Sequence, residues 1–403
     1  MKEPKIRFKG FNAEWKECVL EDCLEVCTET NCNGLYNKND VLSVSDEYGV
    51  VNQIKHLGRS YAGKSVTDYK ILRPHQIVYT KSPLRNKPFG IIKENLNQTG
   101  IVSVLYAVYN AKESVYPNFI QKYFDPYSRI NRYLLPLVNK GAKNTLNISD
   151  ETALQGKICI PESIDEQNVI CKSLNNIEAL IAACTSRLAS LKQVKAASLQ
   201  SMFPQEGETT PRVRFKGFEG EWEKVQFSKL YEPSSIKNKT FGADKIISVA
   251  NMYFKPVSYI SDEEYLKSYN VMNLGDIAFE GNKSKNYAHG RFVENTIGDG
   301  IVSHVFIVLK PISKQYDLQF WKYLINYERI MGPILLRSTK HSTMMTDLVV
   351  SDFLKESVLV PSYEEQQAIG IFLKTLDRQI TLQTQRLDKL KQIKSACLDN
   401  MFV

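Results

Sequence analysis

The first pattern with possible chemistry is a phosphate-binding loop. Gly58–Ser65 reads GRSYAGKS and satisfies G-x-x-x-x-G-K-[S/T], in which backbone amides and the lysine surround phosphates. That chemistry requires a buried strand before the loop and a helix directly after it. Val50–Leu57 is too polar for a central strand, and Val66–Leu72 favours a strand over a helix. We therefore expect a Gly-rich loop whose Arg59 and Lys64 contact phosphate, and keep a nucleotide-binding enzyme as the alternative.

Other catalytic motifs do not stand out. The sequence lacks the Asp/Asn-Pro-Pro-aromatic tetrapeptide that amino-methyltransferases use, and it lacks a Gly-rich loop with dinucleotide spacing. Among only 5 histidines, no Ser/His/Asp or Cys/His arrangement is evident. We expect a chain that is not an enzyme and that holds no cofactor or metal of its own. A methyltransferase fused to its own recognition domain is the rival in the enzyme class.

One unit is present twice in the chain. Lys5–Phe11 (KIRFKGF) recurs as Arg212–Phe218 (RVRFKGF), and each is followed four residues later by a Trp. Near the other end, Arg187–Phe203 recurs as Arg386–Phe402, with L-K-Q-x-K and a final Met-Phe in both. Matching ends around divergent middles indicate a duplicated scaffold that carries two different variable domains.

A cysteine cluster lies near the start of the first copy. It consists of Cys18, Cys23, Cys27 and Cys32, four of 8 cysteines in the chain. The spacing lacks the paired C-x2-C of zinc sites, and the second copy has Val, Leu, Ser and Lys at these positions. We expect free thiols, some buried as small apolar side chains, with metal binding as the weaker alternative.

The middle of each copy is predicted to be an α+β domain. Apolar, β-branched and aromatic runs bounded by Gly, Asn and Pro predict strands. These runs are Gln76–Tyr79, Phe89–Ile92 and Ile101–Val108 in the first copy, and Asp276–Phe279 and Ile301–Leu309 in the second. Helices are expected at Pro117–Phe124 and Leu318–Arg329.

Each copy ends in a long helix. Ser163 and Ser362 begin S-x-x-E patterns typical of a capping box. Apolar residues then recur in steps of three, four and seven, which places them on one stripe. The stripe of the other copy is the simplest partner, in an antiparallel coiled coil of about forty residues and about 60 Å. The predicted helix-pair interface is Ile177, Ile181, Leu188, Leu191, Leu376, Ile380, Leu387 and Leu390.

The order of these motifs resembles the specificity subunit of type I restriction-modification systems. R-F-x-G-F-x-x-E-W, a variable domain, a Ser-x-x-Glu-Gln helix start and L-K-Q-x-K ending in Met-Phe occur in both copies, so the resemblance covers essentially the whole chain. It implies target recognition domains at residues 1–160 and 206–360, each reading one half of a bipartite site on double-stranded DNA. Spacer helices would occupy residues 161–205 and 361–403, with a pseudo-two-fold internal repeat.

The same resemblance implies partners. Two methyltransferase subunits would dock on the spacer helices, and restriction/translocase subunits would join them. Adenine would be methylated with S-adenosylmethionine on a partner, and ATP and Mg would also be held by partners. A specificity subunit of another restriction type with the same repeat is a further alternative.

Charge and hydropathy are compatible with this interpretation. A net charge of +8 and a pI of about 8.8 suit a polyanion but fall short of a strongly basic nucleic-acid binder. The sequence has no apolar run of membrane-spanning length and no signal-peptide pattern, so we expect a cytoplasmic protein without a membrane partner.

Polar and basic loops at equivalent places in both copies are the candidate DNA contacts. Residues 80–87 follow one predicted strand, and residues 280–287 follow its counterpart. Arg, Lys and Asn are the side chains that meet guanine and adenine edges in the major groove, although some will hold only phosphate. A second pair of basic segments lies at residues 140–144 and 337–343. The candidates are Arg59, Lys64, Lys81, Arg85, Asn86, Lys87, Arg132, Lys140, Lys143, Lys283, Lys285, Asn286, Arg337, Lys340 and His341.

The start motif allows two interpretations. Arg7 and Arg214 could contact phosphate, with Trp15 and Trp222 stacking on bases. Aromatic residues in a recurring frame more often belong to a core, so we expect them to pack at the junction between the long helix and the domain.

Overall fold

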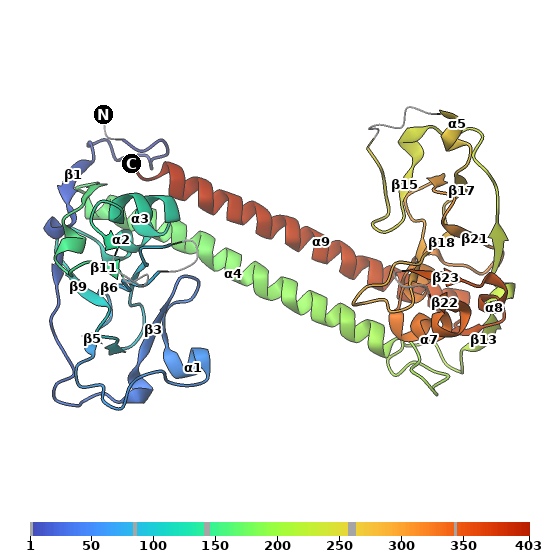
Figure 1. Cartoon of the computed structure of the whole chain (residues 1–403), viewed down its shortest axis with the longest axis horizontal. Coiled ribbons are helices and arrows are strands. Elements are labelled where there is room, and N and C mark those ends of the chain that lie inside the picture. The colour runs from blue at the N-terminus through green and yellow to red at the C-terminus, as the bar shows by residue number, and fades with distance from the viewer. Residues whose placement is uncertain (1–2, 84–86, 141–145, 257–262, 342–344) are drawn as a thin grey trace. The chain divides into compact units, whose positions relative to one another are not determined.

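The chain folds into two compact units. The computed structural model describes residues 3–83, 87–140, 146–256, 263–341 and 345–403. The first unit comprises Met1–Thr185 with Gln385–Val403, and the second comprises Ser186–Thr384. Each unit thus combines one variable middle with parts of both long helices (Figure 1).

Short strands and helices make up the first unit before its long helix. In chain order they are β1 (Lys16–Val19), β2 (Leu24–Val26), β3 (Leu42–Ser45), β4 (Gly49–Asn52), α1 (Gln53–Leu57), β5 (Lys70–Leu72), β6 (Ile77–Tyr79), β7 (Ile92–Glu94), β8 (Gly100–Val102), β9 (Ala107–Ala111), α2 (Pro117–Phe124), α3 (Tyr127–Leu134), β10 (Asn139–Lys140), β11 (Leu146–Asn147) and β12 (Lys157–Ile160). Short 3-10 helices lie at Leu20–Asp22, Lys38–Asp40 and Thr152–Leu154.

The second unit repeats this sequence of elements with small differences. They are β13 (Glu223–Gln226), β14 (Tyr231–Ser234), β15 (Ile247–Ser248), β16 (Tyr253–Phe254), α5 (Glu263–Leu266), β17 (Asn270–Met272), β18 (Ile277–Glu280), β19 (Arg291–Glu294), β20 (Gly300–Val302), β21 (Ile307–Pro311), α6 (Leu318–Leu324), α7 (Glu328–Ser338), β22 (Thr339–His341), β23 (Thr346–Leu348), α8 (Val350–Phe353) and β24 (Ser357–Val360). Its 3-10 helices are Phe227–Lys229 and Ala243–Lys245.

The two units share one sheet topology. A four-stranded antiparallel sheet has the order β2-β9-β6-β7 in the first unit and β14-β21-β18-β19 in the second. The strand before each long helix pairs antiparallel with the strand after the start motif, β12 with β1 and β24 with β13. Because unlike sequences give the same strand order, the duplication extends through the variable middles.

The long helices pair in opposite directions within each unit. They are α4 (Ile164–Ser201) and α9 (Tyr363–Asn400), of 38 residues each. In the first unit, Leu174 near the start of α4 shares a core with Phe402 just after the end of α9. In the second, Leu373 near the start of α9 shares a core with Phe203 just after α4. The predicted α+β fold with an antiparallel helix pair is confirmed.

Burial along the helices follows the predicted stripe. Every predicted interface residue is buried or half-buried: Ile177, Ile181, Leu387 and Leu390 in the first unit, and Leu188, Leu191, Leu376 and Ile380 in the second. Apolar side chains at these positions lose contact with water, which favours helix pairing.

Some predicted elements are divided in the structure. Ile101–Val108 forms two strands, β8 and β9, because a turn between them bonds the Tyr106 amide to the Ser103 carbonyl at 2.9 Å. Ile301–Leu309 divides in the same way, with Phe306 bonded to Ser303. Leu318–Arg329 is not one helix, since α6 ends at Leu324 and α7 begins at Glu328.

Candidate nucleic-acid interface

A bidentate ion pair joins the start motif to the long helix in each unit. Arg7 donates through Nε and Nη2 to Glu166 at 2.7 and 2.9 Å. Arg214 donates to Glu365 at 2.7 Å through both nitrogens. Both carboxylates are buried, so each pair is stronger than an exposed ion pair. The packing interpretation of these arginines is confirmed, and they are not free for phosphate.

Because of this ion pair, the glutamate of the predicted capping box binds an arginine and not the backbone at the helix start. The Ser163 hydroxyl accepts the Glu166 amide at 3.2 Å, and the Ser362 hydroxyl accepts the Glu365 amide at 3.3 Å. The hydroxyl half of the box is therefore present in both units. Each carboxylate turns to the arginine of the start motif.

The glutamine after each buried carboxylate fixes a nearby loop. Gln167 accepts the Tyr116 amide at 2.7 Å and donates to the Pro161 carbonyl at 2.9 Å. Gln366 makes the equivalent pair of bonds, with Asp317 and Pro361, at 3.2 Å each. Helix start, preceding strand and domain loop are thus held together in the same way in both copies.

The two tryptophans of the start motif are core residues. Trp15 and Trp222 are both 3% exposed, and their rings make edge contacts with Phe402 and Phe203 respectively. Trp15 also donates to Glu166 at 3.2 Å. The Trp222 indole nitrogen has no hydrogen-bond partner within the described part of the chain. Neither ring is available to stack on a base.

The Gly58–Ser65 segment lacks the context of a phosphate-binding loop. It follows helix α1, with Gly58 in the left-handed region at φ 77° as the helix cap, and strand β5 is the next element. Helix, loop and strand are the reverse of the required order, so the nucleotide-binding alternative is wrong for this segment. Arg59 lies over the Tyr61 ring at 4.6 Å, and Lys64 is exposed.

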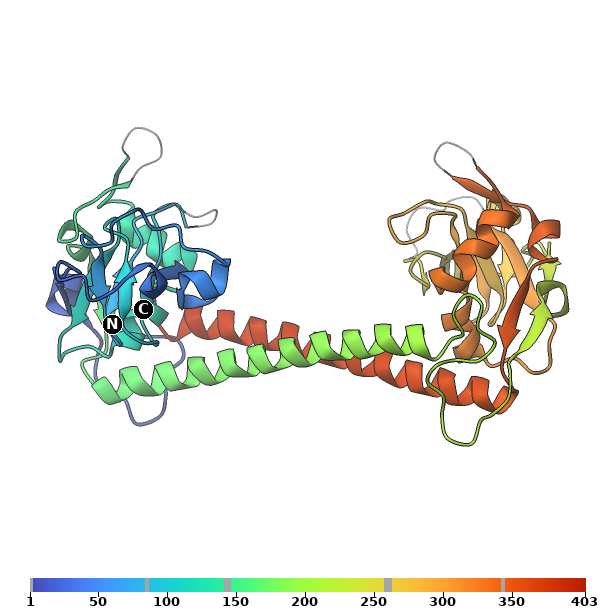
Figure 2. The same ribbon diagram turned by 90° about the horizontal axis from the view of Figure 1, so that it is seen from below.

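In the second unit the two predicted DNA-contact segments lie together. Thr346 on β23 donates from its amide to the Gly281 carbonyl at 2.9 Å, and from its hydroxyl to the His289 carbonyl at 3.0 Å. A β-bridge links Asn282 to Met345. The loop after β18 is therefore joined to the β22–β23 hairpin, which extends on the side of this unit away from α9 (Figure 2).

In the first unit Asp150, which follows β11, is bonded to Lys81 of the predicted DNA-contact loop. Its carboxylate accepts hydrogen bonds from Lys70 and Lys81, the latter at 2.5 Å. Burial opposes ionisation, but the two lysines lower the pKa of Asp150. The β10–β11 hairpin beside this site also extends on the side away from α4 (Figure 2).

The predicted DNA contacts differ in their burial and in the bonds that they make within the protein. Lys87 is only 7% exposed and donates to Asp46 at 2.6 Å and to the Asp125 carbonyl at 3.0 Å, so its ammonium holds the domain together. Arg337 makes a bidentate pair with Glu356 at 2.9 and 2.7 Å. The candidates with exposed side chains are Arg59, Lys64, Arg132, Lys283, Lys285, Asn286, Arg337 and Lys340.

Some candidates cannot be placed. Arg85, Asn86 and Lys143 lie outside the described residues. Lys140 belongs to β10 and His341 to β22, but their side chains are not described. Their assignment as DNA contacts stays a prediction, as does that of the other candidates.

Sequence reasoning missed Arg291. Its Nε donates to Glu280 at 2.8 Å, and its guanidinium lies over the Tyr287 ring at 5.0 Å. Arg291 thereby orders the loop that carries Lys285 and Asn286. The signal was the cross-strand pairing of Glu280 with Arg291, which requires a strand register that sequence does not supply.

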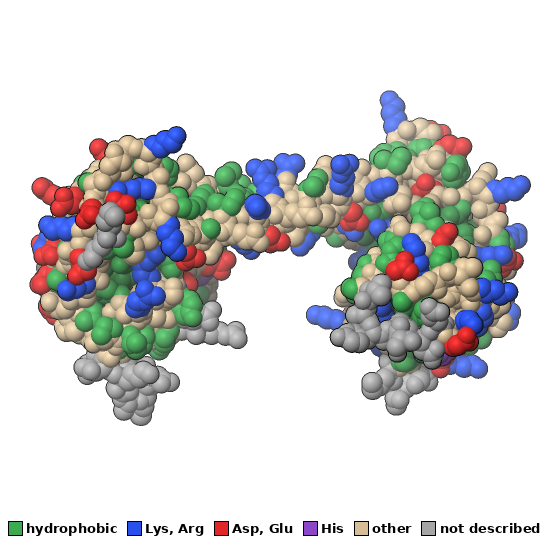
Figure 3. Space-filling model, turned by 90° about the horizontal axis from the view of Figure 1, so that it is seen from above, with side chains coloured by type: hydrophobic (Ala, Val, Ile, Leu, Met, Phe, Trp, Pro, Cys, Tyr) green, Lys and Arg blue, Asp and Glu red, His purple; other side chains and the backbone are tan. Residues whose placement is uncertain are grey.

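Basic side chains also cover the long helices. Figure 3 shows Lys and Arg gathered along α4 and α9, and Arg187, Lys192, Arg386, Lys389 and Lys391 are all exposed. Among the described residues, no group of three or more His, Cys, Asp or Glu could hold a metal. Across the same ranges, no helix is long and apolar enough to cross a membrane.

Comparison with known proteins connects this architecture to a family. Residues 221–392 match the model of the type I restriction modification DNA specificity domain. The remainder of the chain repeats the same strand order and the same junction. The chain therefore carries a type I restriction-modification DNA specificity domain. It is a DNA sequence-specificity subunit, and members of this family are the DNA-recognition component of their systems.

One solved structure has a similar fold. The S subunit of a type I system from M. genitalium matches with a TM-score of 0.56 and 12% identity, over 100% of this chain and 99% of that chain. The HsdS subunit from Thermoanaerobacter tengcongensis matches with a TM-score of 0.46 and 14% identity, over 100% and 99%. No curated protein sequence matches the chain.

Proposed function

We propose that this chain is the non-catalytic subunit that reads a bipartite target on double-stranded DNA, one half-site per recognition domain. Residues 1–160 and 206–360 are the recognition domains, and residues 161–205 and 361–403 are the spacer helices. The loops beside the β10–β11 and β22–β23 hairpins contact the DNA. Side chains there meet base edges in the major groove, while lysines on the rim hold phosphate.

One observation carries the proposal: the same Arg–Glu ion pair and the same Gln bonds support unlike loops in the two units. Arg, Glu and Gln make the same bonds in both units, at Arg7–Glu166 and Arg214–Glu365. The loops differ, because Lys81 is bonded to Asp150 whereas Lys285 is exposed. A constant scaffold under variable loops is what two independent half-site specificities require.

Partner subunits are expected to use the long helices. Two methyltransferase subunits would dock there, bringing S-adenosylmethionine, and restriction/translocase subunits would bring ATP and Mg. Exposed apolar side chains beside the basic ones support this proposal. They are Leu180, at 45%, in the first unit and Leu382, at 53%, in the second, and such side chains gain from burial against a partner.

A domain exchange tests the proposal. Residues 20–155 are replaced with the corresponding segment of another family member, and methylome sequencing of a host that carries the system returns the modified motif. One half of the target should change and the other should stay. If both halves change together, the two domains do not read independently.

A second measurement separates the system types. Copurification of the chain with a methyltransferase subunit and a restriction/translocase subunit supports the type I assignment. Association with another kind of restriction subunit supports the alternative with the same repeat layout. Activity in the isolated chain, as ATP hydrolysis or DNA methylation, would contradict the non-catalytic role.

A further inference from the structure

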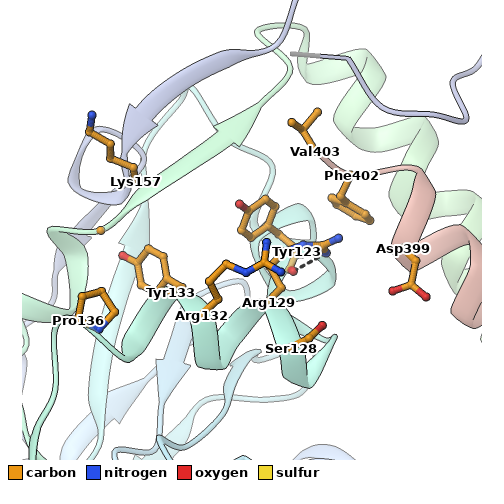
Figure 4. A pocket seen from close by; sticks show the side chains of 11 residues that line it. Tyr123, Ser128, Arg129, Arg132, Tyr133, Pro136, Lys157, Asp399, Phe402 and Val403 are labelled. Carbon is orange, nitrogen blue, oxygen red and sulfur yellow. Dashed lines mark hydrogen bonds between the residues drawn. The ribbon is translucent and has the colours of Figure 1, made fainter. Parts of the chain in front are cut away.

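The first unit contains a cavity on the side of α3 that faces the end of α9. Its volume is about 400 Å³, at the lower end of the range for small-molecule sites. Helix α3 supplies Arg129, Arg132 and Tyr133, strand β12 supplies Lys157, and the end of α9 supplies Asp399, with Phe402 just beyond (Figure 4). Among the described residues, none of β10 or β11 lines this cavity, whereas Arg132, one of the predicted DNA contacts, does.

Arg129 is held in place by the protein. Its guanidinium donates to the carbonyls of Tyr123 and Leu398 at 2.8 Å each. It also lies over the rings of Tyr123 and Phe402, at 5.1 and 4.9 Å. A guanidinium has five N–H donors, so donors remain for a ligand after these two bonds. Immobilisation lowers the entropy cost of binding an anion.

Arg132 adds a second cation one helical turn further along α3. It is exposed, and no ion pair or hydrogen bond is recorded for it among the described residues. Burial lowers the pKa of Arg129, Asp399 acts in the opposite direction, and the charge of Arg132 adds slightly to the lowering. Lys157 also lines the cavity, but its ammonium is paired at 3.1 Å with Glu17 and points away from the two arginines (Figure 4). The lining therefore has more positive than negative side chains, which favours an anionic ligand.

The second unit does not repeat this set of charges. Ser128-Arg129-Ile130 corresponds to Glu328-Arg329-Ile330, so Gly332 stands where the first unit has Arg132. Ser357 stands in place of Lys157, at the first position of β24 as Lys157 is of β12. The second unit has the same fold without these two cations, so the fold does not depend on them. We infer that they serve a function specific to the first unit.

We propose that this cavity binds a small organic phosphate, with the phosphate held by Arg129 and Arg132. Guanidinium groups match the geometry of phosphate oxygens and bind them through paired, charge-assisted hydrogen bonds. A volume of about 400 Å³ leaves room for more than the phosphate group itself. The ligand class is therefore of mononucleotide size.

The test uses the purified full-length chain and calorimetric titration. Adenosine 5′-monophosphate, inorganic phosphate and adenosine are the three probes. We expect the monophosphate to bind at one site, phosphate to bind more weakly, and adenosine not to bind. Arg132→Gln should weaken binding of the monophosphate by roughly tenfold, the scale of one charge-assisted hydrogen bond. Lys157→Ser should leave the affinity close to that of the parent, because this ammonium points away from the two arginines.

Arg329→Gln is the matched control, since it changes the equivalent of Arg129 in the second unit. Its affinity for the monophosphate should equal that of the parent. The proposal is overturned if the monophosphate does not bind, if adenosine binds as well, or if Arg132→Gln has no effect. Loss of binding in Lys64→Ala would place the ligand in the Gly58–Ser65 loop and would also overturn it.

DNA phosphate is the other source of the same chemistry. A short duplex is therefore titrated against the chain with and without saturating monophosphate. Independent binding of the two supports a small-molecule site. Complete displacement of the monophosphate by DNA, with no monophosphate effect beyond that of inorganic phosphate, means that the cavity is a backbone contact and overturns the proposal.

Discussion

Glu178 on α4 and Lys394 on α9 form an ion pair, with 2.9 Å between Oε1 and Nζ. The other carboxylate oxygen of Glu178 accepts from Lys122 of α2 at 2.6 Å. One carboxylate therefore connects the recognition domain of the first unit to both long helices. The second unit has the same design, with Asp377 bonded to Lys195 at 2.6 Å and to the Tyr323 hydroxyl at 2.7 Å.

Both lysines belong to the repeated L-K-Q-x-K motif. Lys195 and Lys394 are its second lysine in each copy, so the motif has a structural meaning. It fixes the axial register of one helix against the other within a unit. If only an apolar stripe held the two helices together, one helix could slip along the other by one turn. An ion pair between the helices that also contacts the recognition domain selects one alignment.

Glu178→Gln should destabilise the first unit. Lys122 is 1% exposed at its side chain and would keep a buried charge without a carboxylate. The expected cost is about 2 kcal/mol in the free energy of unfolding, below the value for a fully buried pair because Glu178 is partly exposed. Adding Lys122→Met should recover most of that loss. Chemical denaturation of the single and double variants gives the coupling energy, and simple additivity would contradict the buried pair.

The two units differ at equivalent carboxylates on β7 and β19. Glu94 accepts from His75 at 2.9 Å and from Asn118 at 2.8 Å. Glu294 is equally buried, but neither oxygen has a hydrogen-bond partner of normal geometry among the described residues. The nearby Tyr316 hydroxyl is bonded to Tyr231. Burial raises the pKa of Glu294 well above its usual range.

Glu294→Gln should stabilise the second unit at neutral pH. A carboxyl group whose pKa is raised on folding favours the folded state fully below its unfolded pKa, and this contribution is lost as pH rises through the folded pKa. The variant should gain about 1 kcal/mol at pH 7 and nothing near pH 4. Glu94→Gln should lose stability instead, because one acceptor is removed. Hydrogen exchange resolves the two units, and equal signs would refute the contrast.

Asp276 should make a smaller contribution to the pH dependence of stability, in the same direction as Glu294. Burial raises its pKa to about 6, and Oδ2 accepts the Asn273 amide at 2.7 Å. Asp276→Asn keeps an acceptor and removes the charge. The stability of the second unit should then depend less on pH between about 4 and 7. Urea denaturation at several pH values measures that slope, and an unchanged slope would assign the pH dependence to other groups.

Lys285→Ala and Lys87→Ala separate DNA contact from packing. Lys285 is exposed on the loop after β18, so its loss should weaken DNA binding by about 1 kcal/mol and lower the salt slope by about 1. Lys87 is buried against Asp46, so its loss should lower thermal stability and leave the salt slope unchanged. Fluorescence titration with duplex DNA over a range of salt concentrations checks both, and a lower slope for Lys87→Ala would reverse the assignment.

Local patterns predicted the parts of the fold that depend on neighbouring residues. The bounds of α2 agree with the predicted Pro117–Phe124, and the helix stripe is half-buried at Ile177 and buried at Leu376, as periodicity requires. Turns were harder to predict, because the turn that begins at Ser103 interrupts a segment that is apolar before and after it. A turn that depends on one backbone bond leaves little trace in composition.

Contacts between residues distant in sequence were not predictable. The sequence predicted Lys87 as a DNA contact, whereas in the structure Lys87 is bonded to Asp46. Glu166 looked like a helix cap until Arg7 was seen to bind it. Duplication was the exception, because residues retained in both copies, such as Arg7 and Arg214, prove to make the same bond.

The structure also gives the cysteine cluster a testable property. Cys18 and Cys23 have their sulfur atoms 3.8 Å apart, and the hydrogen bond from Cys23 lowers the pKa of Cys18. Cys18 is partly exposed and Cys23 is buried, so an oxidant reaches Cys18 first. Hydrogen peroxide should convert its thiol to a sulfenic acid with release of water. The Cys23 sulfur should then displace a second water and form the disulfide.

Oxidation is best followed in a Cys32→Ser background, because Cys32 is the exposed cysteine. Mass spectrometry should find one intramolecular disulfide, between Cys18 and Cys23, with the buried thiols still reduced. Adding Cys23→Ser should leave Cys18 as a sulfenic acid that a dimedone reagent traps. The reaction should quicken as pH rises through the lowered pKa of Cys18, since the thiolate is the nucleophile. A disulfide to any other cysteine in the parent background would show that this pair is not the reactive one.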